Sequence, residues 1–224
     1  MAHKRTYGDV CGVARALDIV GERWALLIVR ELLLGPKRFT DLRVDLPHVS
    51  PDVLAQRLRD LGAAGVVHKR RLPPPAASQI YELSELGAGL EPVVMALGRW
   101  GALLPLPTGE LAMSFDAHIL SLRTLFDPER AGDLHARVQL DLGDQRFRAE
   151  IAGARFEIER GEADAPDAVV TSDAGTLLAI AHGRLELAEA RRAGDVSIDG
   201  DEQVAERFVG LFPLPECALQ GQPA

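Results

Sequence analysis

The chain has 224 residues and a formal net charge of −8, with 47% hydrophobic and 26% charged residues. This length holds one large or two small domains, because domains cluster around ~100–150 residues. The longest apolar stretch, Trp24 to Leu34, is interrupted by charges and falls short of the ~20 residues of a membrane-spanning helix. The charged first residues lead into no apolar run, so we expect no secretory signal, and two cysteines make no disulfide framework. We therefore expect a cytoplasmic protein that does not bind membranes.

The charge is divided unevenly along the chain. Residues 1–105 contain 14 Lys and Arg against 11 Asp and Glu, a net charge of +3, whereas residues 106–224 carry −11. All three lysines lie in the first half. Such asymmetry is a weak indication of a nucleic-acid-binding module joined to a domain with another task.

The first hundred residues predict helices followed by a β-hairpin. Apolar residues recur at helical spacing from Leu17 to Leu32, with Gly21 as a break between two helices. Gly35-Pro36 ends the second helix, since proline cannot continue it.

Two further short helices are predicted from capping residues. Thr40 can cap the first of them, and Pro47 ends it. Ser50 caps the next, with Pro51 at the first helical position, where a missing N–H costs nothing. The inward face of this second helix carries Leu54, Leu58 and Leu61.

A hairpin and a last helix complete the first half. Val66–Leu72 and Gln79–Leu83 predict two strands around a proline-rich turn, and Ser84 can cap a final helix that runs to about Leu104. Short helix, capped helix and basic hairpin in this order are typical of a winged helix-turn-helix.

The second half predicts alternating strands and helices. Three period-2 segments between residues 138 and 159 indicate an antiparallel meander with one solvated face. The other expected elements are helices over 115–126, 174–181 and 204–212, and strands over 169–171 and 196–198. The fold class is therefore α+β: an N-terminal winged helix-turn-helix over 1–105, a linker over 106–112, a small α+β domain with an antiparallel sheet over 113–212, and a loose tail over 213–224.

The helix after Ser50 is the candidate recognition helix. With its leucines inward, Asp52, Val53, Gln56 and Arg59 project outward. Gln can pair with adenine, Arg with guanine and Asp with cytosine, whereas Arg57 is better placed for a phosphate. A solvated helix face is the alternative interpretation of the same polar residues.

The hairpin carries a run of cations, His68-Lys69-Arg70-Arg71. This run suits a wing that touches phosphates or the minor groove, and a charged edge strand is the alternative. The complete set of predicted DNA-binding residues is Lys37, Arg38, Thr40, Ser50, Pro51, Asp52, Val53, Gln56, Arg57, Arg59, His68, Lys69, Arg70 and Arg71.

The first half also resembles a known family. The residues that carry the resemblance are Gly21-Glu22-Arg23-Trp24, Leu26 to Leu32, Gly35 to Phe39, Asp41-Leu42-Arg43, Ser50-Pro51, Gln56-Arg57-Leu58, Gly65-Val66-Val67, Tyr81-Glu82-Leu83, Leu86-Gly87 and Trp100-Gly101. Over residues 8–104 the chain is similar to the HxlR-type regulators, although Glu22-Arg23 and Ser84 depart from the usual residues. The resemblance implies homodimers, built from the first and last helices of the module, that bind palindromic operators in double-stranded DNA.

Cys11 has two interpretations. In some HxlR-type relatives the cysteine at this position senses oxidants, which requires a lowered pKa and solvent access. Free cysteine is also among the most buried residues, and the charges around Cys11 are mixed. We favour a packed structural cysteine over a redox switch.

The second half resembles a sterol carrier protein type 2-like domain. The resemblance rests on the meander, Asp167 to Thr171, Leu177 to Ile180, Ala193 to Asp201 and Val204 to Phe212. It implies an apolar tunnel that holds a hydrophobic small-molecule effector by burial; the alternative is that the phenylalanines fill a solid core. The candidate ligand-binding residues are Phe115, Phe126, Phe147, Ala149, Phe156, Leu177, Leu178, Phe208 and Phe212.

No enzyme signature, cofactor motif or metal-spaced Cys/His set is present in the sequence. The sequence therefore favours a ligand-responsive DNA-binding regulator without a cofactor. Two alternatives remain: a thiol-based redox repressor whose C-terminal half is purely structural, and a lipid carrier or an enzyme of the sterol-carrier type.

Overall fold

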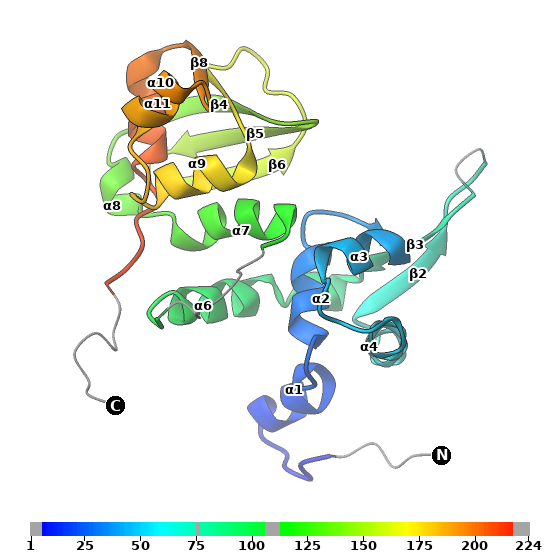
Figure 1. Ribbon diagram of the computed structural model, residues 1–224. Coiled ribbons are helices and arrows are strands. Elements are labelled where there is room, and N and C mark those ends of the chain that lie inside the picture. The colour runs from blue at the N-terminus through cyan, green and yellow to red at the C-terminus, as the bar shows by residue number, and fades with distance from the viewer. Residues whose placement is uncertain (1–5, 75–76, 106–112, 217–224) are drawn as a thin grey trace. The chain divides into compact units, whose positions relative to one another are not determined.

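The computed structural model describes residues 6–74, 77–105 and 113–216 (Figure 1). The described chain forms two compact units, with the boundary between Val94 and Met95. This boundary falls inside a helix, ahead of the predicted linker at 106–112. The linker itself and residues 217–224 of the predicted tail lie outside the described residues.

The first unit contains the predicted helices and hairpin. Its elements are α1 (Gly12–Val20), α2 (Ala25–Leu32), β1 (Lys37–Arg38), α3 (Phe39–Asp45), α4 (Pro51–Ala63), β2 (Val67–Arg71), β3 (Gln79–Leu83), α5 (Glu85–Ala88) and α6 (Glu91–Gly101), which continues into the second unit. The three strands form an antiparallel sheet in the order β1-β3-β2, and β2 and β3 form the projecting hairpin of Figure 1.

The apolar face predicted for α4 forms part of the core of this unit. Leu54, Leu58 and Leu61 are all buried, and they belong to one apolar cluster with Ile28 and Leu42. Each such side chain stabilises the fold by about 1.5–3 kcal/mol through burial. The inward direction of these leucines leaves the polar residues of α4 on the outside.

Two details of the predicted helices were wrong. Thr40 does not cap α3: the helix begins at Phe39, and the Asp41 carboxylate accepts a hydrogen bond from the backbone N–H of Arg38 (2.9 Å). The single final helix expected after Ser84 is two helices, α5 and α6. Ser84 does cap α5, accepting from the Gly87 N–H (3.0 Å).

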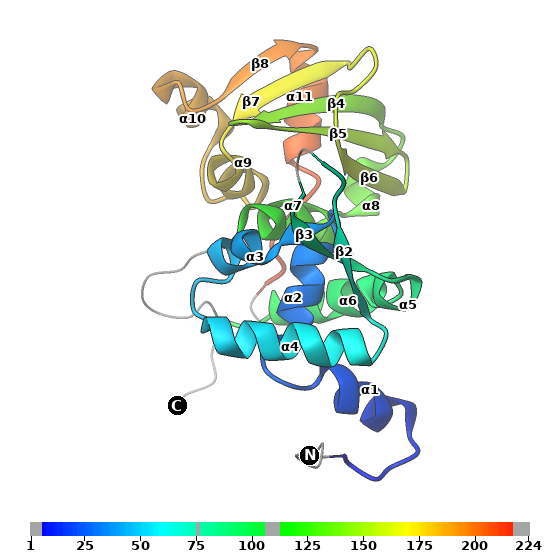
Figure 2. The same cartoon turned by 90° about the vertical axis from the view of Figure 1, so that its right-hand side faces the viewer.

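The second unit is a five-stranded sheet with helices. Its further elements are α7 (Phe115–Leu125), α8 (Pro128–Ala131), β4 (His135–Leu142), β5 (Gln145–Ala152), β6 (Arg155–Arg160), β7 (Ala168–Ser172), α9 (Ala174–Ala181), α10 (Leu187–Ala193), β8 (Ser197–Gly200) and α11 (Glu202–Val209). The strand order is β6-β5-β4-β7-β8 (Figure 2).

The sheet is mixed, which corrects the expected antiparallel sheet. β4, β5 and β6 form the predicted antiparallel meander, but β7 lies parallel to β4. After β6 the chain crosses to the other side of β4, and along this crossing Gln139 of β4 accepts a hydrogen bond from the Ala163 N–H (2.6 Å). A connection of this kind allows a parallel neighbour, whereas a short hairpin does not.

Candidate nucleic-acid interface

Helix α4 presents the predicted base-reading side chains to solvent. Ser50 caps its N-terminus by accepting a hydrogen bond from the Val53 N–H (3.4 Å), with Pro51 at the first helical position. The buried leucines fix the rotation of the helix about its axis, so Gln56 and Arg59 are exposed. Asp52 and Val53 are also exposed, nearer the N-terminus of the helix.

The side chains predicted to read bases hydrogen-bond to each other along the helix surface. Arg59 Nη2 donates to Gln56 Oε1 (2.6 Å), and Gln56 Nε2 donates to Asp60 Oδ1 (2.7 Å). These bonds are made on an exposed surface, where an exchange for other partners costs little. Both side chains can therefore leave these bonds for another polar partner at little cost.

Arg57 is held by two carboxylates. Its Nη1 donates to Asp60 Oδ2 (2.6 Å) and its Nη2 lies 3.3 Å from Glu22 Oε2 of the α1–α2 connection. The Arg57 side chain is only 20% exposed. This arginine fastens α4 to the preceding helices, a role that the sequence prediction of a phosphate contact did not include.

Lys37 is also held in a network of ion pairs. Its ammonium lies 3.0 Å from Glu31 Oε2 and contacts Asp45 Oδ2, and Arg30 Nη2 lies 2.6 Å from the other oxygen of Glu31. Glu31 is fully buried, and a buried carboxylate requires such partners. A charged residue within the apolar run of α2 was the sequence signal for this network. Arg38 and Thr40, in contrast, are exposed.

The cations of the wing differ in their surroundings. Arg70 makes a two-bond pair with Glu82 across the hairpin, Nε to Oε1 at 2.9 Å and Nη2 to Oε2 at 3.0 Å. This hydrogen bonding raises the pKa of Arg70 and lowers the pKa of Glu82. His68, Lys69 and Arg71 are exposed, and Lys69 Nζ lies 5.8 Å from the centre of the Tyr81 ring.

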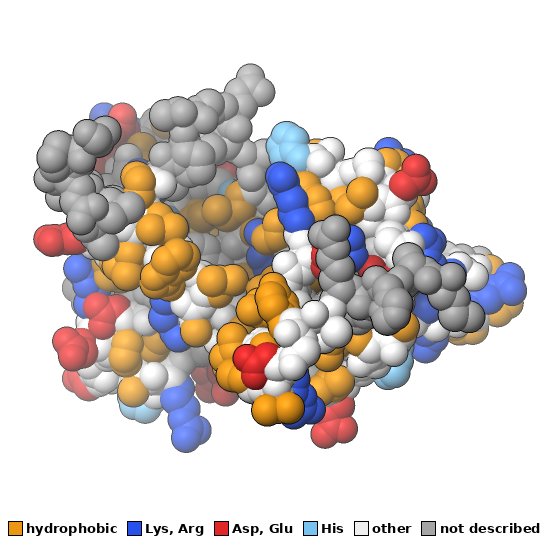
Figure 3. Space-filling view, turned by 90° about the horizontal axis from the view of Figure 1, so that it is seen from below, with side chains coloured by type: hydrophobic (Ala, Val, Ile, Leu, Met, Phe, Trp, Pro, Cys, Tyr) orange, Lys and Arg blue, Asp and Glu red, His pale blue; other side chains and the backbone are white. Residues whose placement is uncertain are grey.

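Helices α1 and α6 expose rows of apolar side chains. Figure 3 shows hydrophobic side chains gathered in patches on one face of the molecule. The exposed large apolar residues on or next to these helices are Val10, Val13, Leu17, Val93, Leu97, Trp100 and Leu104. Side chains of this size at helical spacing are typical of a face that another surface covers.

Cys11 is exposed, so the expected packed cysteine was wrong. It lies immediately before α1, and the backbone N–H groups of Val13 and then Ala14 lower the pKa of its thiol by stabilising the thiolate. The prediction was wrong because it relied on the average burial of free cysteines in proteins. In this chain the segment before the first helix runs along the surface.

The residues predicted to bind a hydrophobic ligand fall into two groups of rings. Phe126, Phe156, Phe208 and Phe212 contact one another, with ring centres 5.0–6.3 Å apart. Phe115 instead stacks on Phe147 at 5.7 Å. The remaining predicted residues, Ala149, Leu177 and Leu178, are buried.

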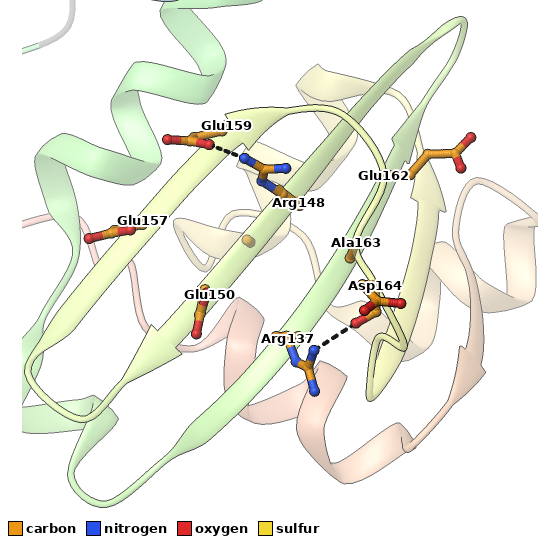
Figure 4. A pocket seen from close by; sticks show the side chains of 9 residues that line it. Arg137, Arg148, Glu150, Glu157, Glu159, Glu162, Ala163 and Asp164 are labelled. Carbon is orange, nitrogen blue, oxygen red and sulfur yellow. Dashed lines mark hydrogen bonds and ion pairs between the residues drawn. The ribbon is translucent and has the colours of Figure 1, made fainter.

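A hollow of about 310 Å³ lies on the outer side of the sheet of the second unit (Figure 4). Charged side chains line it, among them Arg137, Arg148, Glu150 and Glu157. Arg148 Nη2 lies 2.5 Å from Glu159 Oε2, and Arg137 Nη1 donates to the Asp164 carbonyl oxygen (2.8 Å). The lining is unlike the apolar site expected from the sequence.

In the described part of the chain no helix combines the length and apolar character of a membrane span. Within the same residues no three His, Cys, Asp or Glu side chains gather as a metal site would require.

Two protein families match the chain, one in each half. The HxlR-like helix-turn-helix family matches residues 19–105, and the alkyl sulfatase C-terminal family matches residues 111–218. The second match does not name the sterol-carrier-like domain that the sequence suggested.

Relatives of the first half are regulators. The HTH-type transcriptional regulator YvaP of Bacillus subtilis, itself uncharacterized, is 36% identical over 86 residues, 38% of this chain and 80% of YvaP. YodB of the same organism is 35% identical over 38% of this chain and 76% of YodB. The solved structure of the redox regulator HypR in its oxidized form is 31% identical, with a TM-score of 0.41 over 43% of this chain and all of HypR. The chain therefore belongs to the HxlR-like helix-turn-helix family of transcriptional regulators.

Proposed function

We propose that this regulator binds a palindromic operator as a homodimer, with α4 in the major groove and the β2–β3 wing on the flanking backbone. The observation that carries the proposal is the exposed Gln56–Arg59 pair on α4, beside a strand that bears exposed cations. Base edges are read by side chains of this kind, and phosphates are held by cations.

The dimer is proposed from the exposed apolar rows on α1 and α6. Trp100 alone leaves 59% of its surface exposed, with Leu97 47% exposed on the same helix. A second copy that covers such side chains removes apolar surface from water, and a two-fold dimer on a palindromic operator places its two recognition helices about one helical turn of DNA apart, ~10 bp.

The purified protein is expected to be a dimer that prefers particular genomic fragments over random DNA, with an affinity that falls steeply as salt rises. Each phosphate contact releases counterions from the DNA. The slope of log affinity against log salt concentration therefore becomes steeper by about 0.9 for each phosphate contact. A salt-titrated binding assay, with the mass measured by light scattering, checks both points. A monomer, or equal binding to every fragment at each salt concentration, would contradict the proposal.

For the second unit we propose a hydrophobic effector that alters operator affinity. What supports it is the apolar interior between sheet and helices, rich in phenylalanine. A ligand in this interior would separate phenylalanine rings that now contact one another, so its binding would change the conformation of the second unit. A ligand can alter operator affinity only if it binds two conformations of the protein with different affinity. Native mass spectrometry of freshly purified protein is the test, and a mass equal to the bare chain in every preparation counts against the effector.

A second candidate function is thiol-based sensing at Cys11, favoured by its exposure and the lowered pKa of its thiol. More thiolate at neutral pH means faster reaction with electrophiles. Alkylation by iodoacetamide is therefore expected to have a pH midpoint below that of an ordinary exposed cysteine. Mild oxidation is expected to weaken operator binding by the parent protein and not by Cys11→Ser. Equal loss of binding in both proteins would exclude Cys11 as the sensor.

A further inference from the structure

A hollow of about 480 Å³ lies between α4 and the first strand of the wing. Helix α4 contributes Ala55, Leu58 and Arg59 to its lining, and the two wing strands contribute Val67, Lys69 and Tyr81. Sites for small organic ligands have volumes of ~300–1,000 Å³. The hollow is therefore large enough for a small ligand, and it adjoins both elements proposed to contact DNA.

The inner part of this hollow is apolar. Leu58 and Val67 are each only 3% exposed, and Ala55 and Tyr81 are half-buried. The ammonium of Lys69 lies 5.8 Å from the centre of the Tyr81 ring. An aromatic ligand gains from burial against such side chains, whereas a bare phosphate does not.

The rim of the hollow is cationic. Arg59 and Lys69 are exposed, and none of the lining residues is acidic. The carboxylates nearest in sequence are engaged elsewhere: Asp60 binds Arg57, and Glu82 binds Arg70. The electrostatics of the hollow therefore favour an anion, and a guanidinium recognises a carboxylate through two parallel hydrogen bonds.

We propose that this hollow binds a small aromatic carboxylate, and that its occupancy weakens DNA binding. The carboxylate pairs with Arg59 and Lys69, and the ring lies against Leu58 and Tyr81. Arg59 now donates to Gln56 on the base-reading side of α4. A ligand that engages Arg59 withdraws it from DNA, so ligand and operator oppose each other by the same factor in both directions. The expected effect on DNA binding rests on the proposed function of α4, whereas the binding of the aromatic carboxylate does not.

The test is a calorimetric titration of the full-length protein, without DNA, with 1-naphthoate and with its neutral analogue 1-naphthamide. Saturable binding of 1-naphthoate is expected, with 1-naphthamide at least about tenfold weaker because it lacks the charge-assisted hydrogen bonds. Lys69→Gln is expected to weaken 1-naphthoate by about tenfold, and Lys69→Arg to restore most of the affinity. The matched control is Arg71→Gln, which removes a charge from the same strand outside the lining and is expected to leave the affinity unchanged.

The proposal is overturned if 1-naphthoate shows no saturable binding, if 1-naphthamide binds equally well, or if Lys69→Gln and Arg71→Gln behave alike. Inorganic phosphate that binds as tightly as 1-naphthoate overturns it as well, because the hollow would then be a phosphodiester site of the DNA interface. The same ligand added to the protein–operator complex should release DNA from the parent and from Arg71→Gln at similar concentrations, and from Lys69→Gln only at about tenfold higher concentration. If the protein binds 1-naphthoate in a charge-dependent way but prefers no operator, the ligand site is supported and the proposed function is refuted. If it binds an operator but not 1-naphthoate, the proposed function is supported and the ligand site is refuted.

Discussion

Lys37→Met is expected to lower the free energy of unfolding by about 1.5–3 kcal/mol, because it removes one of the cations that bind the buried Glu31 carboxylate. Glu31 is fully buried, and the Lys37 ammonium lies 3.0 Å from one of its oxygens. With Lys37 gone, Arg30 remains on the other oxygen of Glu31, so the buried carboxylate keeps this cation and loses the one on Lys37. Urea denaturation monitored by circular dichroism measures the change.

Arg38→Met is the matched control, because Arg38 is the next residue on β1 and is exposed. Its stability is expected to change by less than about 0.5 kcal/mol. The double change Lys37→Met with Glu31→Leu is expected to recover part of the loss, since the fully buried carboxylate is then absent. If Lys37→Met instead keeps full stability and loses operator affinity, Lys37 contacts DNA and the ion-pair interpretation is wrong.

Arg59→Ala is expected to weaken operator binding by about 1–3 kcal/mol and to relax the preference at one base pair. Arg59 is exposed on α4, and within the described residues its side chain donates a hydrogen bond to Gln56 on the same exposed surface. Gln56→Ala is expected to relax the preference at a neighbouring base pair for the same reason. Binding to a library of operators with single base-pair changes measures both effects.

Arg71→Ala is the comparison for these variants. It removes one exposed wing cation, so it is expected to weaken all sequences equally and to reduce the salt slope by about one contact. Arg70→Ala is expected to have less effect on DNA, because Arg70 is already paired with Glu82. If Arg71→Ala changes base preference while Arg59→Ala and Gln56→Ala do not, the wing and not α4 reads the sequence.

Much of the fold could be predicted because it rests on local patterns. The spacing of Leu54, Leu58 and Leu61 set which side of α4 is buried, and hence which polar residues are exposed. Ser50-Pro51 marked its first turn, since an N-cap acts within three residues. The alternation of residues in β4 to β6 similarly predicted their antiparallel pairing.

Tertiary structure decided the features that depend on residues far apart in the chain. The parallel pairing of β7 with β4 could not be predicted, because the alternation of apolar and polar residues within a strand does not determine which strand lies beside it. Cys11 is exposed because of the path of the backbone before α1, which the average burial of cysteine does not describe.

The sequence by itself determined the order of the elements, the exposed side of α4 and the position of the basic wing, because the period of apolar residues and the capping groups act over a few residues. Only the tertiary structure decided which cations face solvent. Lys37, Arg57 and Arg70 are held by carboxylates from Glu31, Glu22 and Glu82, and Arg59 and Lys69 meet across one hollow. An ion pair or a hollow exists only where the fold brings separate elements within a few ångströms. The sequence gives the charge of each residue but not the distance between residues that are far apart in the chain.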